Sequence, residues 1–218
     1  MVTAKDKQPV RNLLLNYLHS IPESTLRKMR LLDFGNGPGN LIPFMQVQPK
    51  YFAVVDKSAG SLHKAASVAK QHAMNVDLIC GDIVNAQFEQ KFDLIIASNS
   101  ILPESREKVV NILSKLRSLL NRSGRLLAIL PSFDTTIYLQ DLKRQAYESD
   151  DEIVMRMDKD LLAYADDGKH FQCYHVLESI RKETRLAGLE IIGKLQKVYY
   201  PWGLSKRFGY GYYPQSKE

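Results

Sequence analysis

The chain has 218 residues, of which 44% are hydrophobic and 25% charged, a composition that suits one soluble α/β domain with a sizeable core. It has no signal peptide and no apolar run long enough to cross a bilayer, so we expect a cytoplasmic protein without a membrane partner. Cys80 and Cys173 lie far apart with no CxxC or Cys/His cluster, which argues against a disulfide framework and a metal site. The formal net charge of +6 is typical of solvated helix faces with a basic tail, and does not by itself indicate nucleic-acid binding.

Helix and strand patterns alternate along the first 131 residues. Apolar residues at helical spacing predict helices, and short β-branched or aromatic runs predict strands. In chain order we expect a helix at 10–20, a strand at 30–34, a short helix at 41–46, a strand at 51–55, a helix at 59–72 capped by Ser58, strands at 76–80 and 92–98, a helix at 104–120, a turn at 121–124 and a strand at 125–130. This alternation predicts a doubly wound, mostly parallel sheet with helices on both faces.

The pattern changes after Pro131. We expect helices at 135–148 and 152–164, a short strand at 171–175, a helix at 176–187, and an antiparallel hairpin of strands at 189–200 and 207–213. Residues 1–218 then form a single domain with four parts. These are an N-terminal helix or lid (1–29), a ligand-binding core (30–131), a helical substrate insertion (132–178), and a last helix with the C-terminal hairpin (179–218).

A glycine-rich loop follows the first predicted strand, in the stretch LLDFGNGPGN at 31–40. Glycines at every second position let the backbone turn sharply and expose its amides to a ligand, at the sheet edge where open parallel sheets bind ligands. A dinucleotide site of the form G-x-G-x-x-G requires a third glycine where this chain has Asn40. Asp33 would also repel a pyrophosphate, whereas it suits a ligand that carries a cationic amine.

This stretch resembles the first motif of class I S-adenosylmethionine (SAM)-dependent methyltransferases, two hydrophobic residues followed by D/E-x-G-x-G-x-G. Asp56 after the second strand resembles the acid of that family that binds the ribose, and Asp82 after the third resembles the acid that binds the adenine amino group. Residues 92–99 resemble the family's fourth motif, and 123–127 resemble its turn into strand five. The resemblance covers 30–131 strongly and the C-terminal hairpin weakly.

The resemblance implies a Rossmann-like, seven-stranded sheet that binds SAM and releases S-adenosylhomocysteine (SAH). It implies that 30–131 is the SAM-binding core. The cofactor-binding residues that it implies are Asp33, Phe34, Gly35, Asn36, Gly37, Gly39, Asn40, Asp56, Lys57, Gly81, Asp82, Ile83, Ser98 and Asn99.

The sequence says less about the molecule that accepts the methyl group. Residues 98–103 read SNSILP and lack the proline pair and aromatic residue with which base-methylating enzymes of this fold grip a planar base, which favours a small-molecule acceptor. Methyl transfer is an in-line displacement that mainly requires alignment, so no obligatory base is expected. Asn99 and His175 are the candidate catalytic residues, and His175 or His170 could act as a general base for an oxygen nucleophile, or simply hydrogen-bond within the fold.

Three alternatives remain open at this point. Basic segments and the aromatic tail at 199–213 are compatible with a methyltransferase that acts on RNA or protein. The lack of an evident catalytic residue is compatible with a SAM-binding subunit without turnover of its own. An NAD-dependent oxidoreductase is disfavoured by Asn40 and Asp33. A monomer and a homodimer are equally compatible with the sequence.

Overall fold

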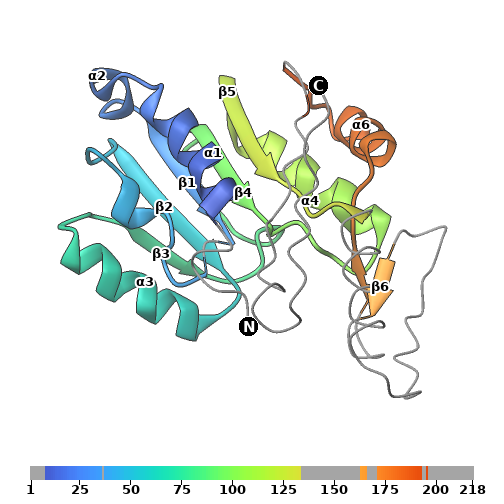
Figure 1. Ribbon diagram of the computed structural model, residues 1–218, viewed down its shortest axis with the longest axis horizontal. Helices are drawn as coiled ribbons and strands as arrows, with labels where there is room; N and C mark the ends of the chain where they lie inside the picture. The colour runs from blue at the N-terminus through green and yellow to red at the C-terminus, as the bar shows by residue number, and fades with distance from the viewer. Residues whose placement is uncertain (1–7, 36, 134–162, 166–170, 193–194, 196–218) are drawn as a thin grey trace, which may run out of the picture.

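The computed structural model of the chain describes residues 8–35, 37–133, 163–165, 171–192 and 195. Five strands form a central sheet in the order β3-β2-β1-β4-β5, and every neighbouring pair is parallel (Figure 1). The strands are β1 (Arg30–Phe34), β2 (Tyr51–Asp56), β3 (Asp77–Cys80), β4 (Phe92–Ser98) and β5 (Leu120–Ile129). The predicted Rossmann-like α/β fold with a mostly parallel sheet is therefore confirmed.

Successive residues of the central strands enter two different cores, one on each face of the sheet. Leu31 belongs to one buried cluster and Leu32 to the other, and the same alternation separates Val54 from Val55. The cluster of Leu31 contains residues of α1 (Gln8–His19), α2 (Glu23–Leu26) and α3 (Ala59–Gln71). The cluster of Leu32 contains residues of α4 (Arg106–Leu119), against which α6 (Leu177–Leu186) packs. Helices thus cover both faces, which is why the strands are near-continuous apolar runs.

Two of the long helices begin at serine caps. The Ser58 hydroxyl accepts a hydrogen bond from the Ser61 amide at 3.2 Å, as expected for the start of α3. The Ser105 hydroxyl accepts one from the Lys108 amide at 3.3 Å at the start of α4. Each cap satisfies an amide that the first turn of a helix leaves without a backbone partner. Within the part of the chain that the structure describes, no helix combines the length and apolar character needed to span a bilayer.

Several predicted elements differ from the structure. The helix α4 passes directly into β5, so the turn predicted at 121–124 is part of the strand. Gly124 lies there because a Cβ atom would come within 2.7 Å of the Phe92 carbonyl oxygen, and the pairing of β4 with β5 shifts register at this point. The short helix predicted at 41–46 is a 3₁₀ turn, η1 (Ile42–Phe44).

The C-terminal part is described only in pieces. Residues at the end of the helix predicted at 152–164 form a strand instead, because β6 (Ala163–Ala165) pairs antiparallel with β7 (Phe171–Cys173). Residues 189–192 have no regular structure, so the strand predicted to begin at 189 does not begin there. The helix predicted at 135–148, the strand at 207–213 and the rest of the strand at 189–200, apart from residue 195, lie outside the described residues.

Candidate functional site

The glycine loop lies at the carboxyl end of β1, where the strand order reverses between β1 and β4. Ligands of open α/β sheets bind at such a switch point. The backbone φ angles of Gly35, Gly37 and Gly39 are +71°, +62° and +87°, a left-handed conformation that favours glycine. The alternating glycines therefore serve the sharp turn that the sequence predicts.

Two of these glycines also permit close contacts. A Cβ atom on Gly35 would lie 2.2 Å from the Cβ of Ser100, in the turn that follows β4. A Cβ atom on Gly39 would lie 3.0 Å from the Cα of Ala65 on α3. The loop is thus packed between the β4 turn on one side and α3 on the other. Only the bare backbone fits between them.

Asp56, the last residue of β2, holds the loop with its carboxylate. Its Oδ2 atom accepts a hydrogen bond from the Gly37 amide at 2.8 Å, and its Oδ1 atom accepts one from the Ser58 amide at 2.8 Å. The carboxylate therefore joins the glycine loop to the start of α3. Each carboxylate oxygen can accept a second hydrogen bond, so both can still bind two hydroxyl groups of a ligand.

Asp33, on β1 directly before the loop, is a buried carboxyl group at 3% exposure. Burial raises its pKa to about 8, and repulsion from the Asp56 carboxylate contributes further. Because the charged form is disfavoured for lack of a compensating charge, a cationic ligand next to this carboxyl would stabilise its ionised form. The Asp33 carboxyl therefore fits an ammonium or sulfonium group better than a phosphate.

The end of β3 places a third carboxylate at the same edge. The Gly81 amide donates to the Asp56 carbonyl oxygen at 3.0 Å, which aligns the ends of β2 and β3. The Oδ1 atom of Asp82 accepts from the Val84 amide at 3.0 Å, and its Oδ2 atom pairs with the Lys57 ammonium at 2.9 Å. The hydrogen bond with Lys57 is the main cause that holds the pKa of Asp82 below its usual range. The Ile83 side chain is buried in the core, so only its backbone could face a ligand.

The turn after β4 lies against the glycine loop. Asn99 has a left-handed φ of +52°, and its amide donates to the Ile129 carbonyl oxygen at 2.8 Å. The Ser100 hydroxyl oxygen is buried and has no hydrogen-bond partner in the described part of the chain. The structure thus brings Ser98 and Asn99 to the same sheet edge as the three carboxylates, as the predicted site requires. Phe34 is buried beneath the loop, Asn40 is exposed within it, and Asn36 is not among the described residues.

His175 is the residue for which the sequence left two roles open, a general base or a hydrogen-bonding residue within the fold. It is buried at 2% exposure, and its Nε2 atom lies 3.1 Å from the Ile101 carbonyl oxygen. Its Nδ1 atom lies 3.3 Å from the Arg106 guanidinium and 3.5 Å from a carboxylate oxygen of Glu183. Both ring nitrogens therefore contact protein groups. His170 lies outside the described residues.

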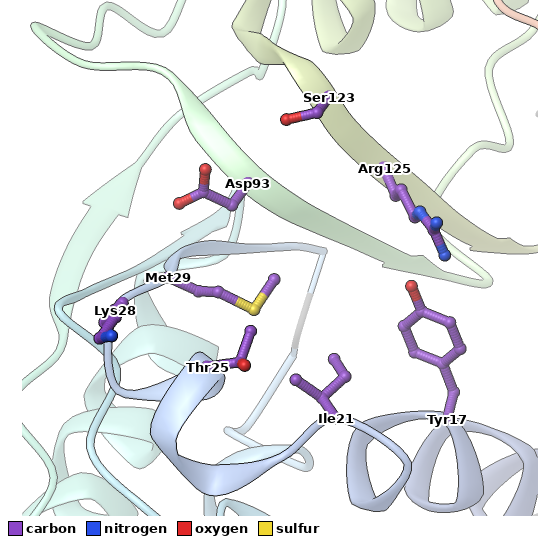
Figure 2. Close-up of a pocket in the computed structure, with 8 residues that line it drawn as sticks. All are labelled: Tyr17, Ile21, Thr25, Lys28, Met29, Asp93, Ser123 and Arg125. Atoms are coloured by element: carbon purple, nitrogen blue, oxygen red, sulfur yellow. The ribbon is translucent and has the colours of Figure 1, made fainter.

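The structure also has a cavity of about 420 Å³ at the opposite edge of the sheet. Figure 2 shows Tyr17, with its hydroxyl directed toward Arg125, and Ile21 across from the beginnings of β4 and β5. The Asp93 carboxylate in its wall is already occupied, since it accepts from the Arg30 amide at 2.7 Å and from the Asn121 side-chain amide at 2.5 Å. The cavity is separate from the glycine loop.

Sequence reasoning missed several residues of this region. Ser100 was not singled out, although its place two residues after β4 and next to Asn99 was available as a signal. The pairing of Arg106 with Glu183 joins residues that are far apart in the chain, and no local pattern announces it. Among the described residues, no group of three His, Cys, Asp or Glu side chains could hold a metal ion.

Comparisons with known proteins agree with this geometry. The model of a family described as a methyltransferase domain matches residues 31–124. A curated relative from Staphylococcus carnosus, described as an uncharacterized methyltransferase, is 25% identical over 138 residues. That alignment covers 63% of this chain and 64% of the relative, so it spans less than two thirds of the relative's length.

Solved structures share the fold. Magnesium protoporphyrin IX methyltransferase from Synechocystis, solved with bound SAH, matches with a TM-score of 0.62 at 17% identity, over 84% of this chain and 73% of that one. The CcbJ methyltransferase from Streptomyces caelestis matches with a TM-score of 0.58 at 16% identity, over 86% and 80% of the two chains. The fold and the glycine motif define a Rossmann-like methyltransferase domain. Residues 31–124 therefore resemble a methyltransferase domain, and the described part of the chain has the fold of methyltransferases that were solved with bound SAM and SAH.

Proposed function

We propose that the chain is a SAM-dependent methyltransferase that acts on a small-molecule acceptor. The observation that carries this proposal is the position of the Asp56 carboxylate, which is hydrogen-bonded to the Gly37 amide at the switch point of the sheet. The carboxylate and the glycine loop there face the same space. A nucleoside attached to an amino acid requires two such groups, a carboxylate that accepts hydrogen bonds from its hydroxyls and a loop backbone without side chains that it can approach closely.

The residues at this edge divide the ligand between them in the proposed site. Asp56 accepts hydrogen bonds from the ribose hydroxyls, and Asp82 accepts one from the adenine amino group once the exposed Lys57 side chain swings aside. Gly35 and Gly39 let the loop pack closely against the β4 turn and α3, which fixes the loop backbone at this edge. The remaining contacts are proposed for the other residues of the predicted set, Asp33, Phe34, Asn36, Gly37, Asn40, Gly81, Ile83, Ser98 and Asn99.

Bound SAM would supply a methyl group on a positively charged sulfur, and the acceptor atom would bond to the methyl carbon as the carbon–sulfur bond breaks and SAH leaves. The contribution of the protein is to align the two and exclude water, and such alignment can lower a barrier by about 7–11 kcal/mol in favourable cases. Asp33 stabilises the positive charge of the bound ligand, because its carboxyl ionises most readily beside a cation. Ser98 and Asn99 form the wall next to the reacting centre. No general base is assigned.

The small-molecule acceptor is supported by two observations. The segment at 98–103 lacks the proline pair and aromatic residue of base-methylating enzymes. The Synechocystis relative is named for magnesium protoporphyrin IX, a small molecule, although at 17% identity this is an argument from fold alone. Acceptor contacts are proposed for 132–178, in the four-part single domain described above. A cytoplasmic location and a monomeric or dimeric state stay predictions.

Calorimetry with SAH tests the proposal. We expect binding by the unmodified chain, and a loss of about tenfold or more in affinity for Asp56→Ala, since hydrogen bonds to a charged group are worth about 1.5–3 kcal/mol. Asp77→Asn is the matched control, because Asp77 begins β3 at the opposite edge of the sheet and should leave the affinity unchanged. No binding at millimolar SAH would refute the proposal. Steeply salt-dependent RNA binding would favour an RNA acceptor instead.

A further inference from the structure

The segment that contains His175 connects the two loops at the carboxyl edge of the sheet. The Cys173 amide donates to the Pro103 carbonyl oxygen at 2.8 Å, in the loop after β4. The His175 amide donates to the Pro131 carbonyl oxygen at 3.0 Å, and its carbonyl accepts from the Phe133 amide at 2.9 Å, both in the segment after β5. Residues 173–175 are therefore a strap, which ties together the loops that follow β4 and β5.

The His175 side chain reaches from this strap toward the glycine loop. Its Nε2 atom lies 3.1 Å from the Ile101 carbonyl oxygen, and a carbonyl can only accept, so Nε2 carries the proton. Ile101 is fully buried and directly follows Ser100, whose Cβ lies against Gly35. The hydrogen bond thus acts on the last residue of the turn that borders the glycine loop.

The other side of the ring is held by a buried ion pair. Arg106, the first residue of α4, pairs with Glu183 of α6, and its Nε atom donates to a Glu183 carboxylate oxygen at 2.6 Å. Arg106 also donates to the Tyr174 carbonyl oxygen at 2.6 Å, and its Nη2 atom lies 3.3 Å from Nδ1 of His175. A guanidinium has no acceptor, so Nδ1 of a neutral ring accepts from Arg106, whereas the Glu183 carboxylate oxygen 3.5 Å away only accepts and would face a proton on Nδ1 in a charged ring. Nε2 carries a proton in both forms.

We propose that His175 is a positioning residue, which holds the turn at 99–101 against the glycine loop through the Ile101 carbonyl, with Arg106 and Glu183 holding the other side of the ring in place. The inference rests on the proposed function only in that the turn borders a SAM site. Asn99 sits in this turn in a left-handed conformation, a backbone state that residues other than glycine keep only when their surroundings hold it. Docking of α6 then sets the geometry of the turn.

The tautomer is the first test, and it needs neither ligand nor activity. The ¹⁵N chemical shifts of the His175 ring in the full chain report which nitrogen carries the proton at neutral pH. We expect Nε2–H with a hydrogen-bonded signature. A neutral ring protonated at Nδ1 would overturn the inference, because the bond to the Ile101 carbonyl would then be absent.

A pair of variants forms the second test. In His175→Gln the side-chain amide nitrogen can occupy the position of Nε2, whereas in His175→Asn the shorter amide reaches only the position of Nδ1. With circular dichroism to check folding, we expect the Gln variant to bind SAH within about threefold of the unmodified chain and the Asn variant to bind about tenfold more weakly. Equal affinities of the two variants would overturn the inference.

Two further outcomes distinguish the positioning role of His175 from a role as general base and from a failure of the proposed function. If the Gln variant keeps its SAH affinity but loses turnover by about a thousandfold, His175 acts as a general base and the positioning role is wrong. If the unmodified chain does not bind SAH, the proposed function fails. The tautomer then still decides whether His175 holds the turn.

Discussion

The contact between Gly35 and Ser100 allows a quantitative test of the glycine loop. Gly35 has a φ of +71°, and a Cβ atom added to it would lie 2.2 Å from the Ser100 Cβ. Gly188, which follows α6, has a φ of +70°, and a Cβ atom there would meet nothing within 4 Å. The two glycines thus share the same backbone conformation, and only one of them is crowded. Replacing each by alanine separates backbone strain from steric clash.

The expected magnitudes follow from these two terms. An L-residue in the left-handed region costs about 1–2 kcal/mol, and this applies equally to Gly35→Ala and Gly188→Ala. Overpacking adds about 1–3 kcal/mol, and this applies only at position 35, where the added Cβ atom would overlap the Ser100 Cβ. We therefore expect the free energy of unfolding to fall by about 1–2 kcal/mol in Gly188→Ala and by about 2–5 kcal/mol in Gly35→Ala.

Urea denaturation measures both values, and a double variant closes the cycle. Adding Ser100→Gly to Gly35→Ala removes the clashing Cβ and leaves the Ser100 Cα at an ordinary 3.4 Å. The Ser100 hydroxyl has no hydrogen-bond partner among the described residues, so its loss should carry little penalty. The double variant should recover most of the difference between the two alanine variants. If Gly35→Ala costs no more than Gly188→Ala, the loop does not pack against the β4 turn as described.

Three further predictions concern single residues. Folding raises the pKa of Asp33 from 3.8 to about 8, so its carboxyl ionises at a lower pH in the unfolded chain than in the folded one. The protonated carboxyl therefore contributes its full stabilisation of the folded state below pH 3.8, and this contribution is lost as the pH rises toward 8. The free energy of unfolding should therefore fall over that range relative to Asp33→Asn, as denaturation at several pH values would show, and parallel curves would contradict the assignment. Asn99→Val should lower the free energy of unfolding by about 1–2 kcal/mol because of its left-handed φ, while Asn99→Gly should not, and an equal loss in urea denaturation of both would refute this reason. Ser105→Ala should lower the free energy of unfolding by about 1 kcal/mol, because α4 loses its cap, whereas the control Ser105→Asp keeps an acceptor. Thermal unfolding measures both variants, and an unchanged midpoint in Ser105→Ala would contradict the prediction.

The parts of the fold that the sequence predicts well are those encoded locally. Buried parallel strands are near-continuous apolar runs, so the five strands were placed within a few residues of their observed bounds, apart from the early start of β5. The glycines of the loop were identified because a left-handed backbone restricts the residue type at a single position. Asp56 and Asp82 were singled out by the resemblance to class I methyltransferases, and the parallel pairing of β2 with β3 brings both to one edge.

The parts that the sequence did not predict depend on partners distant in the chain. Asn121 to Gly124 has the composition of a turn, and the structure includes it as an irregular stretch of β5. Leu120 and Arg125 pair with β4 and the four residues between them do not, while the Asn121 side chain bonds to Asp93 across the irregularity. The sequence leaves His175 open as a general base or as a hydrogen-bonding residue, and its burial and its contacts with Ile101 and Arg106 depend on partners that no local pattern indicates. Titration near neutral pH is a property of the residue type, whereas access to a substrate is a property of the fold.

The distribution of charge bears on which acceptor the site can take. The chain carries a formal net charge of +6, yet the strand ends around the glycine loop present the carboxyl groups of Asp33, Asp56 and Asp82, with Lys57 pairing one of them. Asp33 is mostly protonated at neutral pH because its pKa is about 8, so the ionised groups here are the Asp56 and Asp82 carboxylates against one ammonium, and the local sign is still opposite to that of the whole molecule. A field of this kind attracts a cationic donor such as SAM to the strand ends and disfavours a phosphate backbone running across them. An RNA acceptor would have to approach from a surface away from these carboxylates, and a small neutral or cationic acceptor would not.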